Sequence, residues 1–188
     1  MSSSYLSEAE LKSLGLDDYG DNVRISDAAR IHNPETLSLG SNVRIDDFTV
    51  LTGDITIGSN VHIAPFTSIS GGEGIILEDF ASVSSHVAIF TVTANYTGGS
   101  MANPTIPDEY KPDRDKGPVK LEKHALIGSR SVVLPGITIH EGGSVGAMSL
   151  VNEDVDEWTF YLGYPAQKIK NRDEETIKEL EDDFLSNP

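Results

Sequence analysis

The sequence predicts an all-β solenoid: a parallel β-helix of about five to six triangular coils, with a long inserted loop, a short N-terminal helix and a C-terminal helix. Three observations predict this fold class. Aliphatic residues recur every six positions, the residue four positions after each one is small or β-branched, and turn-forming residues lie between them. Long runs of a single period indicate stacked repeats.

The aliphatic residues form two long series. The first series is Leu39, Ile45, Leu51, Ile57, Ile63 and Ile69, followed after a slip of two residues by Leu77, Val83 and Ile89. The second series is Leu121, Ile127, Val133, Ile139, Val145 and Val151. Six residues turn an α-helix by about 600°, so these side chains cannot share one helical face. Alternate residues of a strand do share a side, so an even period favours strands.

The positions four residues after the aliphatic ones are expected to point inward as well. They are Val43, Thr49, Ile55, Val61, Thr67, Ala81, Val87, Ala125, Ser131, Ile137, Gly143, Ser149 and Val155. Glycine, asparagine, aspartate, proline and serine between them supply the corners. Three hexads make one coil, and a looser set at Ile25 and Ile31 precedes the first complete one.

Composition limits the class of protein. The 188 residues include no cysteine, which excludes disulfides, thiolate metal sites and a cysteine nucleophile. The formal net charge of −16 argues against nucleic acid or an anionic membrane as a partner. No apolar run is long enough to span a membrane, and the first residues show no signal-peptide pattern. We therefore expect a cytoplasmic protein without membrane insertion.

Helices are expected on both sides of the β-helix. Ser7 and Glu10 form a capping-box pattern, and Asn171 and Glu174 repeat it before an acidic, amphipathic segment. The expected organisation is an N-terminal helical cap (1–20), a parallel β-helix (21–160, with a loop insertion at 91–119) and a C-terminal segment with an acidic helix (161–188).

The inserted loop interrupts the period between Ile89 and Leu121 and is rich in proline, glycine and polar residues. A solenoid needs no such loop for its stability. Long loops on rigid scaffolds are usually functional or disordered, and the aromatic and proline content here favours an ordered, functional loop.

Two stretches resemble the hexapeptide-repeat acyltransferases: Ile127–Val151, and Tyr161–Lys170, which is similar to the Gly-x-Pro-Ala segment that ends such domains. The resemblance covers roughly residues 20–170, and residues 37–103 look most like the sugar O- and N-acetyltransferase branch. It implies a left-handed β-helix that moves an acetyl or short acyl group from acetyl-CoA or another acyl-CoA to a sugar hydroxyl or amino group. It also implies cell-surface polysaccharide or nucleotide-sugar biosynthesis, and a homotrimer with active sites between subunits.

The catalytic base of related enzymes is a histidine just after the strand that leads into the loop, where this chain has Ala94 or Asn95. His86, outward on the hexad before the loop, is our candidate proton acceptor, and His124, on the coil after the loop, is the second candidate. The two are expected to be close across one coil step or across a subunit boundary. The alternative for each is an ordinary surface imidazole.

The remaining candidate residues bind the two substrates. Ser129 and Ala147 offer backbone amides to the thioester and pantetheine, Pro165 can pack on the adenine, and Lys168 and Lys170 can bind phosphates of coenzyme A. The candidates for binding the sugar or nucleotide-linked sugar acceptor are Ser84, Asn95, Tyr96 and Asn103. No metal is expected.

Two other functions remain open. A γ-carbonic-anhydrase-like enzyme shares the β-helix but needs three histidine ligands, two of them closely spaced. Here His62 and His86 are 24 residues apart, and His86 and His124 are 38 apart. A non-catalytic β-helix scaffold would not require the loop or the terminal motif. The acceptor sugar, oxygen or nitrogen acceptance, and the acyl length are not readable from the sequence.

Overall fold

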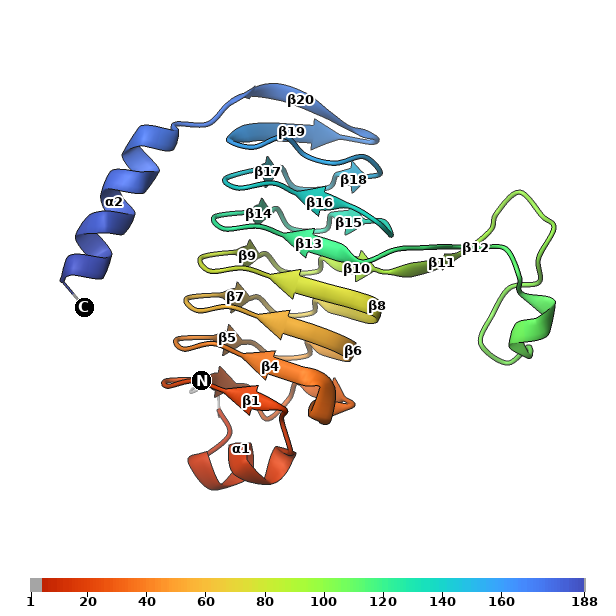
Figure 1. The fold of residues 1–188 in the computed structure, drawn as a ribbon, viewed down its shortest axis with the longest axis horizontal. Coiled ribbons are helices and arrows are strands. Elements are labelled where there is room, and N and C mark those ends of the chain that lie inside the picture. The colour runs from red at the N-terminus through yellow and green to blue at the C-terminus, as the bar shows by residue number, and fades with distance from the viewer. Residues whose placement is uncertain (1–4, 188) are drawn as a thin grey trace.

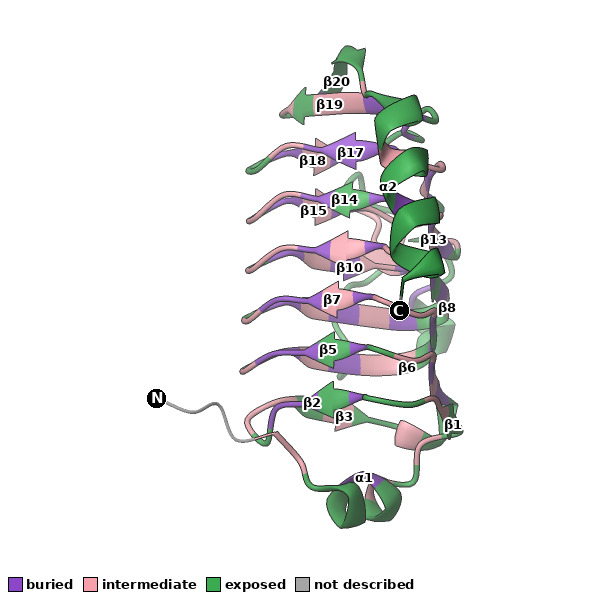
Figure 2. Ribbon diagram, turned by 90° about the vertical axis from the view of Figure 1, so that its left-hand side faces the viewer, coloured by how far each residue is buried: buried purple, intermediate pink, exposed green. Residues whose placement is uncertain are grey.

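The computed structural model describes residues 5–187 and shows a column of stacked coils (Figure 1). Helix α1 (Glu8–Leu14) closes the N-terminal end, and its Leu11 is buried in the core. Helix α2 (Glu174–Ser186) runs along one side of the column (Figures 1 and 2). No helix among the described residues is long and apolar enough to cross a membrane.

The coils have three faces. Face A is a sheet of β2 (Arg24–Ile25), β5 (Arg44–Ile45), β7 (His62–Ile63), β9 (Ser82–Val83), β14 (Leu126–Ile127), β17 (Ser144–Val145), β19 (Thr159–Gly163) and β20 (Ala166–Asn171). Of these eight strands all but β20 run parallel, so the column is one or two coils taller than expected. The additional levels are β2, in the looser set, and β19, where Tyr161 occupies the aliphatic position beside Val145.

Faces B and C share a second sheet, because β6 (Val50–Ile57) and β8 (Ser68–Leu77) turn the corner between them. Face B also contains β3 (Arg30–His32), β10 (Ala88–Phe90), β15 (Val132–Val133) and β18 (Leu150–Val151). Face C also contains β1 (Asp18–Tyr19), β4 (Leu37–Leu39), β13 (Val119–Leu121) and β16 (Thr138–Ile139). A 3₁₀ turn, η1 (Pro34–Thr36), leads into β4. The expected fold class is confirmed.

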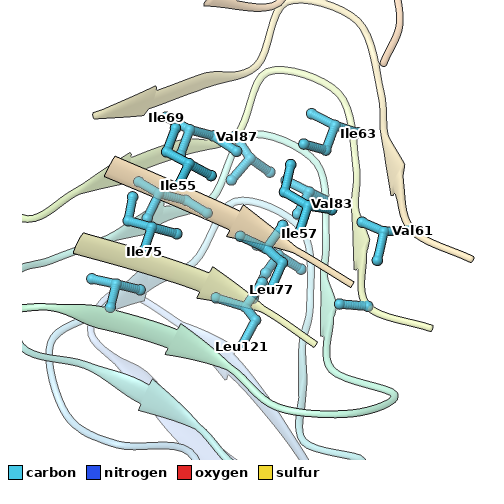
Figure 3. Close-up of a cluster of buried hydrophobic side chains, with 14 of the residues drawn as sticks. Ile55, Ile57, Val61, Ile63, Ile69, Ile75, Leu77, Val83, Val87 and Leu121 are labelled. Atoms are coloured by element: carbon cyan, nitrogen blue, oxygen red, sulfur yellow. The ribbon is translucent and has the colours of Figure 1, made fainter. Parts of the chain in front are cut away.

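The interior is filled by the six-residue series. Ile63, Ile69, Val83 and Val87 are each 0% exposed, and Figure 3 shows them packed between the faces. The predicted inward hydroxyls are buried as well; those of Thr49, Thr67 and Ser131 donate to main-chain carbonyls of the next coil, and that of Ser149 donates to Gly146 O of its own coil. Thr67 Oγ1 donates to Ser84 O at 3.0 Å, for example. The hydrogen bonds offset the cost of burying a hydroxyl, which is why threonine and serine are tolerated inside.

Most corners turn through a residue with positive φ. At the corner between faces C and A these residues are Asn22, Asn42, Asn60, Phe80, His124, Gly142 and Trp158. At the corner between faces A and B they are Phe48, Phe66, His86, Arg130 and Met148. Asparagine adopts this conformation more readily than most residues, and the Asn22, Asn42 and Asn60 amides also bond to one another in a ladder.

The inserted loop leaves the column at the corner between faces B and C. It contains an antiparallel pair, β11 (Val92–Ala94) and β12 (Arg114–Lys116), and a 3₁₀ turn, η2 (Asp108–Tyr110). Figure 1 shows this segment projecting well away from the coils. The Gly117 N–H donates to Thr91 O at 3.0 Å, which ties the two ends of the loop together.

Each terminal helix begins at a residue whose side chain caps the first turn. The Ser7–Glu10 capping box is present. For α2, however, the cap is Asp173, whose side chain accepts a hydrogen bond from Thr176 N, and the pattern starting at Asn171 is wrong by two residues. Asn171 is instead the last residue of β20, where it pairs with Thr159.

Candidate functional site

The corner between faces A and B, which we call the A/B corner, aligns most of the residues predicted to bind coenzyme A. Ser84 and His86 lie on one coil, Ser129 lies on the next, and Ala147 lies on the coil after that. The Ser85 and Ser129 hydroxyls are 3.4 Å apart across one coil step. The turn between β19 and β20, which contains Pro165, ends at the same corner, where Gly163 N donates to Ser149 Oγ at 3.0 Å.

His86 is an exposed residue on a ring stack at the A/B corner. Its imidazole stacks on Phe66 at 4.8 Å between ring centres, and Phe66 stacks on Phe48 at 4.9 Å. Its backbone has φ of 62° and donates a hydrogen bond to Pro65 O. Within residues 5–187 no side chain hydrogen bonds to the imidazole, and the residue is exposed.

The glycines at the A/B corner on the two coils after His86 have a structural reason, which is the close stacking of the coils. A Cβ added at Gly128 would lie 2.5 Å from Ala147 N, and one added at Gly146 would lie 2.6 Å from Leu162 Cδ1. A side chain at Gly128 would meet the backbone of the next coil, whereas one at Gly146 would require the Leu162 and Phe160 side chains to move. Ala147 is exposed at this corner, between the glycine at position 146 and the exposed Met148.

The basic cluster near the C-terminus does not act as one group. Lys168 Nζ pairs with Asp156 Oδ2 at 3.1 Å and lowers the pKa of that carboxyl. Arg172 donates to the main-chain oxygens of His124 and Gly142, and its burial lowers the pKa of the guanidinium. Lys170 is exposed, and within the described chain it forms no ion pair. Arg172 therefore links two coils by hydrogen bonds. Of the three cations, Lys170 is the one left accessible to a ligand.

His124 lies far from His86, on the corner between faces C and A, beneath α2. Its ring stacks on Phe80 at 5.0 Å, and its Nε2 lies 2.8 Å from Glu181 Oε2 of α2. The side chain is only 11% exposed. Burial raises the pKa of Glu181, but hydrogen bonds from Lys123 and His124 outweigh it and hold the pKa below its usual value. One chain therefore does not bring the two histidines together, and the contacts of His124 secure the helix.

The predicted acceptor-binding amides of the loop are engaged within the loop. Asn95 Oδ1 accepts from Thr97 N at 2.8 Å, and Asn95 Nδ2 donates to Asp113 at 2.6 Å. Asn103 Oδ1 likewise accepts from Thr105 N at 2.9 Å. Side chains that close such turns fix the loop conformation. Tyr96 is 87% exposed, and its hydroxyl lies 3.3 Å from Thr93 Oγ1 in the same loop.

Sequence analysis did not single out the cavity beneath this loop. The cavity has a volume of about 690 Å³, and its lining includes Phe90, Val92, Met101, Lys111 and Arg114. This volume is typical of small-molecule sites. The sequence feature that could have indicated this cavity is the group of three basic residues between positions 111 and 116, in a chain that is acidic as a whole.

The histidines do not form a metal site. His62 Nε2 lies 2.8 Å from Asp46 Oδ2 on face A, whereas His86 and His124 lie at two different corners. In the part of the chain that the structure describes, no three histidine, aspartate or glutamate side chains converge as ligands would. The arrangement that a γ-carbonic-anhydrase-like enzyme needs is therefore not formed by these histidines within one chain.

Known proteins resemble this chain over nearly its whole length. Residues 37–71 match the bacterial transferase hexapeptide family (six repeats). The chain is 41% identical to the dTDP-4-amino-4,6-dideoxy-D-glucose acyltransferase of Escherichia coli, over 96% of this chain and 94% of that relative. It superposes with a TM-score of 0.95 on AntD, an N-acyltransferase from Bacillus cereus, in complex with dTDP and 3-hydroxybutyryl-CoA. That match has 46% identity and covers 99% of this chain and 98% of AntD.

A variant of AntD in complex with dTDP-4-amino-4,6-dideoxyglucose and coenzyme A matches equally well. Its TM-score is 0.97 at 44% identity, and the match covers 100% of both chains. The hexads, the terminal Gly-x-Pro-Ala segment and these full-length matches agree. The chain belongs to the hexapeptide-repeat transferase family, and it is an acyl-CoA-dependent acyltransferase built on a left-handed parallel β-helix.

Proposed function

We propose that this chain transfers an acyl group from acyl-CoA to the amino group of a dTDP-linked 4-amino-4,6-dideoxy sugar, for use in cell-surface polysaccharide. The observation that carries the proposal is the full-length match to two acyltransferases of this substrate class. The E. coli relative is named for dTDP-4-amino-4,6-dideoxy-D-glucose, and a variant of AntD was crystallised with that sugar nucleotide. A cytoplasmic location goes with these soluble substrates.

The chemistry is formation of an amide. The neutral amine attacks the thioester carbonyl carbon, the carbon–sulfur bond breaks, and the coenzyme A thiolate leaves and takes up a proton. An amine that has lost its proton is already nucleophilic, so no strongly activated base is needed. His86, an imidazole without a carboxylate partner among the described residues, can accept the proton that the amine loses. Backbone amides near Ser129 and Ala147 can stabilise the developing oxyanion.

A homotrimer would complete the site. In one chain His86 lies at the A/B corner, whereas the loop leaves from the corner between faces B and C, so face B separates them. The loop of a neighbouring copy could bring the acceptor to His86, and the 87% exposed Tyr96 of that loop is our candidate for contacting it. We expect light scattering to give three times the 20.3 kDa chain mass. A fully active monomer would contradict the shared site.

The test of function is a thiol-release assay with acetyl-CoA or 3-hydroxybutyryl-CoA as donor. The acceptor is dTDP-4-amino-4,6-dideoxyglucose, and the matched control is the same sugar nucleotide with a hydroxyl at carbon 4. We expect turnover with the amine alone, and mass spectrometry should find one acyl group on the sugar. Turnover of the hydroxyl analogue instead would contradict N-acylation, and turnover of neither would contradict the substrate class.

A further inference from the structure

Two cations in the loop cavity share a single carboxylate oxygen. Lys111 Nζ lies 3.1 Å from Asp108 Oδ1, and Arg114 Nη1 lies 3.5 Å from the same atom. Lys111 also donates to Asn103 O at 3.3 Å. The carboxylate balances only one of the two positive charges, so the cavity wall keeps a surplus positive charge.

The exposure of the three groups is uneven. The Lys111 side chain is 7% exposed and that of Arg114 is 35% exposed, but that of Asp108 is 76% exposed. Burying an ammonium group is costly unless an anion stays close to it. A carboxylate that is largely in water can turn away at little cost. The cations are therefore fixed features of the cavity, whereas Asp108 is an exchangeable partner.

The rest of the cavity suits a ligand that is partly apolar. Phe90, Val92, Met101 and Pro104 line the same space as the two cations. An apolar wall beside a few convergent polar groups is typical of small-molecule sites, and guanidinium groups match the oxygen geometry of phosphates. A nucleoside diphosphate carries both kinds of surface.

We propose that the loop cavity binds the diphosphate of the nucleotide-linked acceptor, with Lys111 and Arg114 contacting phosphate oxygens and displacing Asp108. This inference rests on the proposed function, which supplies a nucleoside diphosphate, and it assigns that group to two residues of the loop. The sugar would then lie beyond the loop, toward the His86 corner of a neighbouring copy.

Calorimetric titration of the full-length protein with dTDP tests the assignment. Arg114→Gln should weaken dTDP binding by roughly 10- to 100-fold, because one charge-assisted contact is lost. Lys116→Gln is the matched control, since Lys116 lies on the same strand but pairs with Glu73 at 3.8 Å, outside the cavity. Equal effects of the two variants, or no effect of Arg114→Gln, would overturn the proposal.

Asp108→Asn separates a binding role from a structural one. If Asp108 competes with phosphate, its neutralisation should tighten dTDP binding by several-fold. If the three residues only brace the loop, the same change should loosen the loop and weaken binding. Tighter binding therefore supports the proposal, and unchanged or weaker binding contradicts it.

Coenzyme A also carries phosphates, so each variant is titrated with acetyl-CoA as well. Loss of acetyl-CoA affinity in Arg114→Gln, with dTDP affinity retained, would assign the cations to the donor and overturn the proposal. An activity assay separates failure of this phosphate assignment from failure of the proposed function. If the native enzyme acylates the amino sugar but Arg114→Gln binds dTDP normally, only this assignment fails. If dTDP binding depends on Arg114 but no acyl transfer occurs, the assignment stands and the proposed function fails.

Discussion

Replacement of His86 by asparagine removes the imidazole without straining the backbone. Asn22, Asn42 and Asn60 occupy corners with φ of 54°, 57° and 59°, so asparagine fits the φ of 62° at position 86. Alanine would lack this preference for positive φ. The variant thus tests the loss of a proton acceptor with little change in the shape of the corner.

Two roles of His86 predict different magnitudes. As proton acceptor, its loss should lower kcat by about 10²–10⁴-fold. As a mere member of the ring stack, 4.8 Å from Phe66, it contributes only about 0.5–1.5 kcal/mol to stability. For a chain of this size that corresponds to a fall in Tm of roughly 1–6 °C, with kcat nearly unchanged.

The assay is steady-state acyl transfer together with thermal unfolding. The matched control is Phe48→Asn, which removes a ring from the same stack at another positive-φ corner but removes no imidazole. We expect a large fall in kcat for His86→Asn alone, with acyl-CoA affinity retained. A fall in kcat below tenfold, or an equal fall in Phe48→Asn, would refute the reasoning.

Three further predictions concern other parts of the molecule. Lys170→Ala should weaken acyl-CoA binding more than Lys168→Ala, because only Lys168 is held by an ion pair; calorimetry that gives the reverse order would place the phosphates at Lys168. Asn95→Ala should raise the KM of the acceptor more than that of acyl-CoA, since it loosens the loop, and equal changes in kinetic assays would move acceptor recognition elsewhere. Glu181→Gln should lower stability at pH 7 by up to about 3 kcal/mol. The folded pKa of Glu181 lies below its usual value of 4.5, so denaturant unfolding should show this difference shrinking as the pH falls through and below 4.5; a constant difference would contradict the ion pair with His124 and Lys123.

The interior was predictable because strand parity is a local property. Thr49 and Ser131 are polar, yet their place four residues after an aliphatic one predicted burial, and both are 0% exposed. The hexads repeat along the chain, so a single sequence contains many independent instances of the pattern. The acyltransferase activity followed from the resemblance of Ile127–Val151, on the coils, and of the single Tyr161–Lys170 segment in the terminal hairpin.

The site was less predictable because it depends on what covers each corner. His124 and His86 hold equivalent hexad positions, but α2 lies over His124 alone. The path of α2 depends on contacts such as that of Glu181 with His124, which no local sequence pattern predicts. Lys111 and Arg114 were missed because acidic neighbours alternate with them and hide a local excess of positive charge. The roles of His86 and of the coenzyme A residues stay predictions.

The inserted loop leaves the column without disturbing its pairing. Strand β8 pairs with β10 at Ile69 and with β13 at Leu77, as it would if no loop lay between them, and the Thr91–Gly117 hydrogen bond closes the gap. Lengthening such a connection costs little conformational entropy. The coils can therefore fold in the same way whatever the length of the inserted segment. If the loop binds the acceptor as we propose, exchanging residues 92–116 for the loop of a relative should change the acceptor while leaving the pairing of the coils unchanged.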